Sequence, residues 1–220
     1  MTVSLMTRRA TIALAVALLA MPCARTIAAD DTASMPPDQL MQKVSSDMLK
    51  ALDQKRADIR RDPKLAYPLV DQILLPHFDT QYAAQLILAQ NWRTASEDQR
   101  KRFVAALYDA LLKTYAGAIA DFTADRLKIL PLKLDAGATQ TIVKTEVRRD
   151  SGTIVPVDYR MHKTDGGWKV YDVIIEGISY VRNYREDFGA EVAQKGLDEV
   201  IARLEREGLH VDKSGKPSGG

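Results

Sequence analysis

The sequence predicts an α+β fold, in which a helical N-terminal half is followed by an antiparallel sheet and a closing helical part. Apolar residues recur at helical spacing over about residues 36–122, and the period changes to strand-like alternation over residues 126–176. The connections between the expected strands are short and contain Gly and Asp, which favours hairpins and antiparallel pairing. A run of helices followed by a run of strands is typical of the α+β class.

Residues 1–29 are expected to be a cleaved secretory signal peptide. Arg8 and Arg9 precede an apolar run at residues 10–21, and small residues at 26–29 offer a cleavage site at one of the last two alanines. The run is shorter than the roughly 20 apolar residues that a membrane span needs. The alternative is an N-terminal anchor that stays attached. The pattern favours export of the remaining chain.

The predicted mature chain is nearly neutral and has no cysteine. The signal segment contains three arginines, no acidic residue and Cys23, which is the only cysteine of the sequence. Because nucleic-acid-binding domains are usually strongly basic, this charge balance argues against nucleic acid as a partner. An exported protein without a disulfide has to be held together by its apolar core.

Three helices are expected before residue 96. The first begins at Pro36-Pro37, because proline is tolerated in the first turn of a helix. The second is expected at about residues 62–76, and the third begins at Asp79 or Thr80. Each carries apolar residues at helical spacing, which predicts that one side of each helix faces the core.

The longest expected helix spans about residues 97–121. Ser96 and Gln99 have the spacing of a capping box at its start. Its apolar stripe is wider than a single packing contact requires. The stripe includes Leu107, Leu111, Tyr115 and Ile119.

Four consecutive strands are expected after this helix. They are Leu127–Leu134, Thr139–Arg149, Thr153–Lys163 and Trp168–Ile175. Pro131 and Pro156 each lack a backbone donor, so we expect an edge or a bulge at these positions. A closing helical part follows at residues 178–208, and residues 211–220 are expected to form a solvated tail.

Alternation predicts that one face of the sheet is nearly free of charge. On this expected inner face lie Thr141, Val143, Thr145, Val147, Val155, Val157, Tyr159, Met161, Tyr171, Val173 and Ile175. The opposite face carries Lys144, Glu146, Arg148, Asp158, Arg160, Asp172 and Glu176. From the residues alone, a packed core explains the apolar face more simply than a cavity does.

The residues do not indicate an enzyme, a metal site or a cofactor. Asp158 and Asp172 alternate away from the inner face, so the inward Tyr159 and Tyr171 have no acidic partner for acid–base chemistry. The three histidines are not spaced as metal ligands, and His162 alternates to the outer face. No G-x-S-x-G sequence surrounds any serine.

The strand-to-helix segment WKVYDVIIEGISYVRNYR, residues 168–185, resembles the signature of the MlaC family, the periplasmic phospholipid-shuttle or toluene-tolerance proteins. Pro36–Phe122 is similar to the helical part of that family, and QKGLDEVIARLE (Gln194–Glu205) is similar to its closing helix. The resemblance covers nearly all of the predicted mature chain, which would form one domain at residues 30–210.

The resemblance implies a curved sheet that helices wrap into an NTF2-like cone, with an apolar cavity for the acyl tails of a phospholipid. In this sequence, the residues that would line the cavity are Leu107, Leu111, Tyr115, Ile119, Val143, Val147, Val155, Val157, Tyr159, Met161, Tyr171, Val173, Ile175 and Val181.

The resemblance also implies a monomeric carrier in the periplasm. Its expected partners are phospholipid, an inner-membrane ABC transporter complex with an MCE-domain subunit, and an outer-membrane lipoprotein complex. The alternatives are a carrier of another apolar lipid such as a hopanoid, an NTF2-like enzyme acting on a small apolar substrate, and an interaction module with a filled core.

Overall fold

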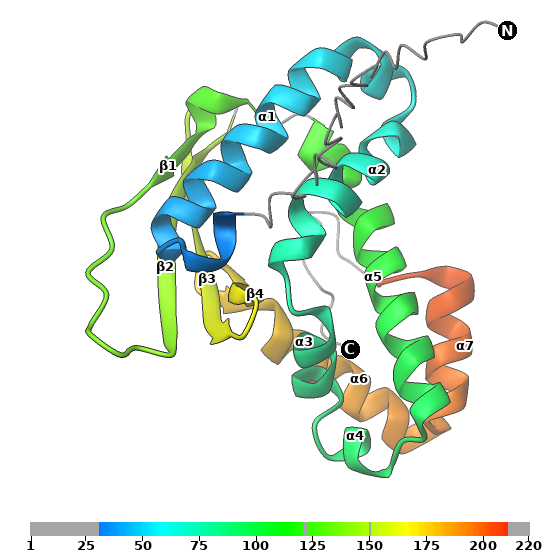
Figure 1. Ribbon diagram of the computed structural model, residues 1–220. Coiled ribbons are helices and arrows are strands. Elements are labelled where there is room, and N and C mark those ends of the chain that lie inside the picture. The colour runs from blue at the N-terminus through cyan, green and yellow to red at the C-terminus, as the bar shows by residue number, and fades with distance from the viewer. Residues whose placement is uncertain (1–30, 121–122, 150, 211–220) are drawn as a thin grey trace, which may run out of the picture. The chain divides into compact units, whose positions relative to one another are not determined.

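The computed structural model describes residues 31–120, 123–149 and 151–210 (Figure 1). The expected signal peptide, Phe122 and the expected tail at 211–220 lie outside these residues, as does the side chain of Ile119. In the described part of the chain, no helix is both long enough and apolar enough to cross a membrane.

The described helices follow the expected order, with more interruptions than the sequence predicts. They are α1 (Pro37–Arg61), α2 (Tyr67–Leu69), α3 (Thr80–Leu88), α4 (Gln90–Thr94), α5 (Glu97–Ala120), α6 (Tyr180–Lys195) and α7 (Leu197–Glu207). The capping box at the start of α5 is confirmed: Gln99 N–H donates to Ser96 Oγ at 3.1 Å, and Ser96 N–H donates to Gln99 Oε1 at 2.9 Å.

The expectation of one continuous second helix at residues 62–76 is wrong. This segment contains a 3-10 turn at Pro63–Ala66, the single turn α2, a π-helical turn at Val70–Leu74 and a second 3-10 turn at Leu75–His77. Pro68 and Pro76 each remove a backbone donor, which prevents a regular α-helical ladder.

The sheet is antiparallel, with its strands in sequence order. It consists of β1 (Leu127–Ile129), β2 (Gln140–Arg148), β3 (Ile154–Thr164), β4 (Gly167–Ile175) and β5 (Ile178–Ser179). The four expected strands are present, but β1 ends five residues earlier than Leu134, and β5 was not predicted. The last bond that this edge makes with β2 comes from Leu130 N–H to the carbonyl of Lys144, at 2.9 Å, and Pro131 has no N–H with which to continue.

Helix α1 packs against one face of the sheet (Figure 1). This is the inner face predicted from alternation. Leu40 and Val44 of α1 contact a buried cluster that comprises Val143, Met161, Trp168 and Val170. Because α1 repeats apolar residues every four positions, a single stripe of the helix makes these contacts.

A second core lies among the helices themselves. Side chains of α3, α5, α6 and α7 form one buried cluster, in which Phe103 of α5 and Phe188 of α6 meet edge to face at 5.3 Å between ring centroids. A smaller cluster joins α1 to the irregular segment 63–74 and to Leu112 of α5. The described residues therefore form a helical core, a sheet core and a smaller cluster, and α1 contributes to the sheet core and to the smaller cluster.

The predicted alternation of β4 is wrong at Tyr171. Met161 pairs with Val170 while Arg160 pairs with Asp172, so Tyr171 is an extra residue in a β-bulge. Its ring lies 5.3 Å from that of His162, on the face opposite Met161. Tyr171 therefore lies on the outer face and not beside Val173.

Asp172 lies on the outer face, as expected, but it is buried and not solvated. Its side chain is 1% exposed, because α6 covers this end of β4. The carboxylate accepts the Ser179 hydroxyl at 2.6 Å and the Val181 N–H at 3.0 Å, and Arg160 lies 3.5 Å away. Ser179 Oγ in turn accepts the Arg182 N–H at 3.1 Å and so caps α6.

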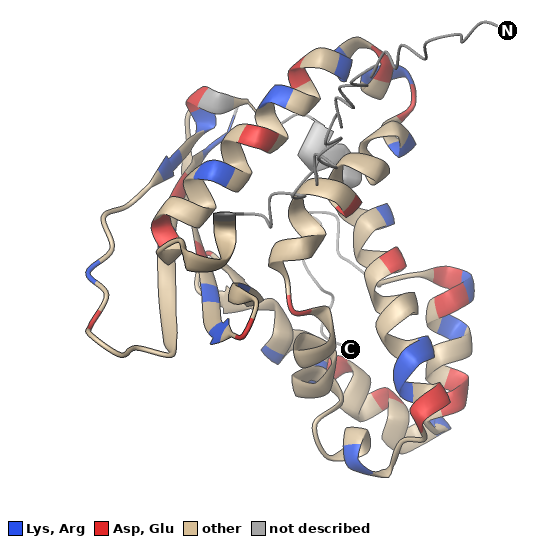
Figure 2. Ribbon diagram, in the orientation of Figure 1, with Lys and Arg blue, Asp and Glu red and all other residues tan. Residues whose placement is uncertain are grey.

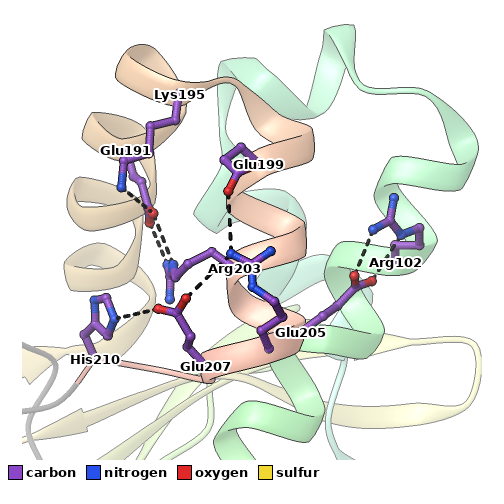
Figure 3. A network of polar contacts seen from close by, with 9 residues as sticks. Arg102, Glu191, Lys195, Glu199, Arg203, Glu205, Glu207 and His210 are labelled. Atoms are coloured by element: carbon purple, nitrogen blue, oxygen red, sulfur yellow. Dashed lines mark hydrogen bonds and ion pairs between the residues drawn. The ribbon is translucent and has the colours of Figure 1, made fainter.

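Figure 2 shows charged residues along the helices, and those of α7 form a network with α5 and α6 (Figure 3). Arg203 is nearly buried and donates to both carboxylate oxygens of Glu191, at 3.1 and 2.6 Å, and to the carbonyl of Gly208 at 2.8 Å. Burial favours a higher pKa for Glu191, but the hydrogen bonds and charge of Arg203 outweigh it and hold that pKa below the usual range.

Replacing Asp172 with alanine is expected to lower the free energy of unfolding by about 2–4 kcal/mol, because the Ser179 hydroxyl and the Val181 N–H would lose their buried acceptor. Chemical denaturation measures this change. Asp158→Ala, on the more exposed outer face of β3, is the matched control and should cost less than about 1 kcal/mol. Equal losses in the two variants would contradict the anchoring role of Asp172.

Arg203→Met is expected to destabilise the fold at neutral pH by about 2 kcal/mol, since Glu191 would lose its bidentate donor. The folded-state pKa of Glu191 is lowered, so the pair stabilises above the ordinary pKa of a glutamate, and the contribution disappears as the pH falls through the folded-state value. Melting temperatures of the variant and the wild type should therefore converge in acid. Lys195→Met removes an exposed lysine that contacts the same Glu191 only at 3.5 Å, and it should change the melting temperature little at any pH.

Candidate functional site

The candidate site comprises the inner-face residues of the sheet that are only partly buried, together with partly buried residues of α5 and α6. The side chains predicted to line a cavity separate into three groups there, according to their burial and to the face that they occupy. This separation distinguishes residues that hold the fold together from residues that could touch a ligand.

The first group is buried. Val143 and Met161 are 0% exposed and contact α1 side chains, whereas Leu107 and Val181 are buried in the helical cluster. Val155 and Val157 are also buried, at 4% and 8% exposure. Such residues set the position of the inner face and have little free surface.

The second group is only partly buried although its side chains are apolar or aromatic. Its members are Leu111, Tyr115, Val147, Tyr159, Val173 and Ile175. Four of them continue the inner face from one strand to the next, since Val147 pairs with Val155 and Tyr159 pairs with Val173. Partly exposed apolar side chains gathered on one face mark a surface that can bind an apolar ligand.

The third group consists of Tyr171 and Ile119. Tyr171 faces outward because of the bulge in β4, and the side chain of Ile119 lies outside the described residues. The prediction that Tyr171 lines the site is therefore incorrect, and the prediction for Ile119 stays a prediction.

A cluster of tyrosines stands where α5 and α6 approach each other, and sequence reasoning included only Tyr115 of it. The hydroxyls of Tyr115 and Tyr184 lie 3.3 Å apart, and the ring of Tyr180 lies 6.0 Å from each of the other two rings. Burial raises the pKa of Tyr184. Tyr180 and Tyr184 are four residues apart on α6, and this helical spacing beside the Gly177 strand break is the signal that could have identified them.

Tyr159 brings a neutral hydroxyl to the middle of the inner face. Burial raises the pKa of Tyr159 to about 12, so the phenol stays protonated at physiological pH. Because its pairing partner on β4 is Val173, Tyr159 and Tyr171 lie on opposite faces. The two tyrosines therefore cannot act together on one small substrate.

On the outer face, His162 contacts residues at the start of α3. Its Nε2 lies 3.0 Å from Asp79 Oδ2, and its ring stacks on Tyr82 at 4.6 Å. Asp79 also accepts the Tyr82 N–H at 2.8 Å, which caps α3. The His162 side chain is only 17% exposed. His162 is therefore not a surface residue, and it joins α3 to the sheet.

The described residues contain no group of three or more His, Cys, Asp or Glu side chains that could hold a metal ion. The chemistry of the inner face is accordingly that of valine, leucine and isoleucine side chains with neutral phenol groups. Such a surface can bind an apolar molecule by burial and can donate a few hydrogen bonds to its polar part.

Comparisons with known proteins agree with this arrangement. A toluene tolerance protein, ttg2D, from Pseudomonas putida is 26% identical over 167 residues, which are 76% of this chain and 77% of that protein. The intermembrane phospholipid transport system binding protein MlaC of Haemophilus influenzae is 23% identical over 179 residues, which are 79% of this chain and 83% of that protein.

A solved structure also matches the fold. The phospholipid-binding protein from Ralstonia solanacearum, solved in complex with a phospholipid, superposes with a TM-score of 0.70 at 26% identity, covering 78% of this chain and 100% of that one. The family model described as "MlaC protein" matches residues 42–206, which include α5, all five strands and α6. This chain belongs to the MlaC family.

Proposed function

We propose that this protein is a phospholipid-binding transport protein that holds acyl tails against the partly buried residues of the inner sheet face. The observation that carries the proposal is that Val147, Tyr159, Val173 and Ile175 of the second group leave apolar side chains partly exposed on this one face. Membership of the MlaC family and the phospholipid complex of the Ralstonia solanacearum relative support the same ligand class.

The energetics of burial limit how such a carrier can work. Burying roughly 30 methylenes of a two-tailed lipid at about 0.8 kcal/mol each would yield some 24 kcal/mol relative to water. That value exceeds the practical limit of about 18–21 kcal/mol for non-covalent binding. The tails are already dry in a bilayer, so the site only has to match the membrane. Transfer is then nearly balanced, and the partners decide its direction.

The proposed place of action is the periplasm, where the protein carries phospholipid between an outer-membrane lipoprotein complex and an inner-membrane ABC transporter complex with an MCE-domain subunit. The signal-peptide pattern of residues 1–29 supports export. The name of the Haemophilus influenzae relative, which places it in an intermembrane phospholipid transport system, supports the route.

The first experiment is native mass spectrometry of the protein purified without detergent, followed by organic extraction and identification of the bound mass. Phospholipid at one or two molecules per chain would support the proposal. A polycyclic lipid would identify another apolar cargo. An empty protein that also takes up no phospholipid from vesicles would contradict lipid transport.

Val147→Trp and Ile175→Trp are expected to reduce bound phospholipid at least fivefold while the protein stays folded. Both positions are partly buried on the inner face, so an indole can occupy the space of a tail without overpacking the two cores. Mass spectrometry measures the lipid, and thermal unfolding checks the fold.

Ile142→Trp is the matched control for these variants. Ile142 lies on β2 as Val147 does, but on the outer face, and it is 39% exposed. It should keep the full lipid content. A large fall in melting temperature for Val147→Trp with unchanged lipid would mean that the inner face is only a packed core.

A further inference from the structure

A groove that the lipid site does not use lies between α1 and the edge strand β1. It has a volume of about 500 Å³, which is within the usual range for binding pockets. Its lining residues are Gln42, Ser45, Ser46, Leu49, Lys50, Asp53, Leu127 and Ile129. One wall is therefore a face of α1, and the other is β1, the edge strand of the sheet among the described residues.

The pairing register shows which backbone groups of β1 are not used by β2. Leu130 donates its N–H to Lys144, so the pair Leu130–Lys144 is a hydrogen-bonded one. Hydrogen-bonded and non-hydrogen-bonded pairs alternate in antiparallel ladders, so Leu127 and Ile129 belong to non-bonded pairs with β2. Their N–H and C=O groups point away from β2. These two are the strand residues that line the groove.

The edge is short, but its own side chains do not block it. Short strands and edge lysines commonly prevent unwanted strand addition. Here Lys128 alternates to the outer face, where its Nζ lies 3.2 Å from a carboxylate oxygen of Glu146. The lysine therefore points away from the wall formed by α1. At the other edge of the sheet, β5 runs directly into α6.

The α1 wall is a polar stripe, distinct from the apolar stripe that packs on the sheet. Gln42, Ser45, Ser46 and Leu49 recur at spacings of three and four residues, which places them on one face of the helix. The hydroxyls and the amide can donate to or accept from a peptide that lies along β1.

Charges along this wall favour an acidic occupant. Asp53 already forms an ion pair with Arg56, whose Nη2 lies 2.5 Å from the Asp53 Oδ1 atom. Lys50 contacts Asp47 only at 3.8 Å, and Lys43 holds the same carboxylate at 2.6 Å. The Lys50 side chain is 71% exposed. A carboxylate that enters the groove would thus meet the ammonium group of Lys50, whose own partner, Asp47, is distant and is shared with Lys43.

We propose that the groove between α1 and β1 binds an extended, acidic peptide segment of a partner protein as an added strand beside Leu127–Ile129. Backbone hydrogen bonds to Leu127 and Ile129 supply affinity, as in other β-strand additions. An acidic side chain of the peptide pairs with Lys50. The added strand would match β1 over about 10 Å, at roughly 3.4 Å per residue.

The test uses two synthetic peptides, acetyl-Thr-Val-Asp-Val-Thr-amide and its counterpart with lysine in place of aspartate. The acidic peptide should bind the purified protein and slow hydrogen exchange at the amides of Leu127 and Ile129, as followed by nuclear magnetic resonance. The lysine peptide should bind at least tenfold more weakly. Failure of the acidic peptide to protect these two amides at millimolar concentration, or equal binding of both peptides, would overturn the proposal.

Ile129→Pro and Ile129→Ala form a matched pair of variants. Both shorten the side chain, but only proline removes the outward N–H, which pairing with β2 does not use. Binding of the acidic peptide should fall at least tenfold in the proline variant and remain in the alanine variant. Equal loss in both would show that the apolar side chain and not the strand edge holds the peptide, which contradicts strand addition.

Lipid content separates this proposal from the proposed function. Ile129→Pro should retain its bound phospholipid, since the groove lies outside the second group of lining residues. Peptide binding should likewise be unchanged in Val147→Trp. If the peptide instead protects amides at Tyr159 and Val173, it occupies the inner face and strand addition at β1 is wrong.

Discussion

The arrangement of sheet and helices depends on the buried carboxylate of Asp172. It accepts one hydrogen bond from the hydroxyl that caps α6 and another from the first turn of that helix, and it does so from within β4. Both bonds form at once only when β4, β5 and α6 adopt a single geometry. The start of α6 then directs Val181 and Tyr184 into the helical core. These hydrogen bonds thereby fix the angle at which the chain passes from the sheet into the helical core.

This junction between the sheet and α6 makes it possible for the inner face of the sheet to stay partly exposed. The sheet core is closed by α1 and the helical core by α3, α5, α6 and α7. The remaining inner-face residues are partly exposed, which an ordinary domain would avoid because apolar surface in water costs free energy. A transport protein can tolerate that cost, since the ligand covers the surface in the loaded state. Stability then comes from the two cores and binding from the face they leave open.

The two candidate surfaces would recognise their ligands through different interactions. The inner face offers apolar area and a few neutral phenols, which suits a ligand recognised by burial. The groove at β1 offers unpaired backbone groups and an exposed lysine, which suits a ligand recognised by directional hydrogen bonds and charge. The groove involves β1, whereas the inner-face site involves β2, β3 and β4. A cargo and a partner could therefore be held at the same time.

Much of this protein follows from the sequence by itself. The change of hydrophobic period separates helices from strands, the hairpin turns make the sheet antiparallel, and the Ser96–Gln99 spacing predicts the start of α5. The segment at residues 168–185 also carries the resemblance that the family match confirms. These are local features, or strings of residues, and they need no knowledge of distant contacts.

Only the tertiary structure decided the rest. The bulge at Tyr171 inverts its side chain because β4 has to accommodate one more residue than β3, and nothing in the alternation of β4 alone shows this. The sequence places Asp172 on a solvated face, but α6 folds back over it, and Tyr184 meets Tyr115 only when α6 packs on α5. Periodicity reports which way a side chain points along its own element. Which of those side chains stay partly exposed is determined by the packing of other elements against them.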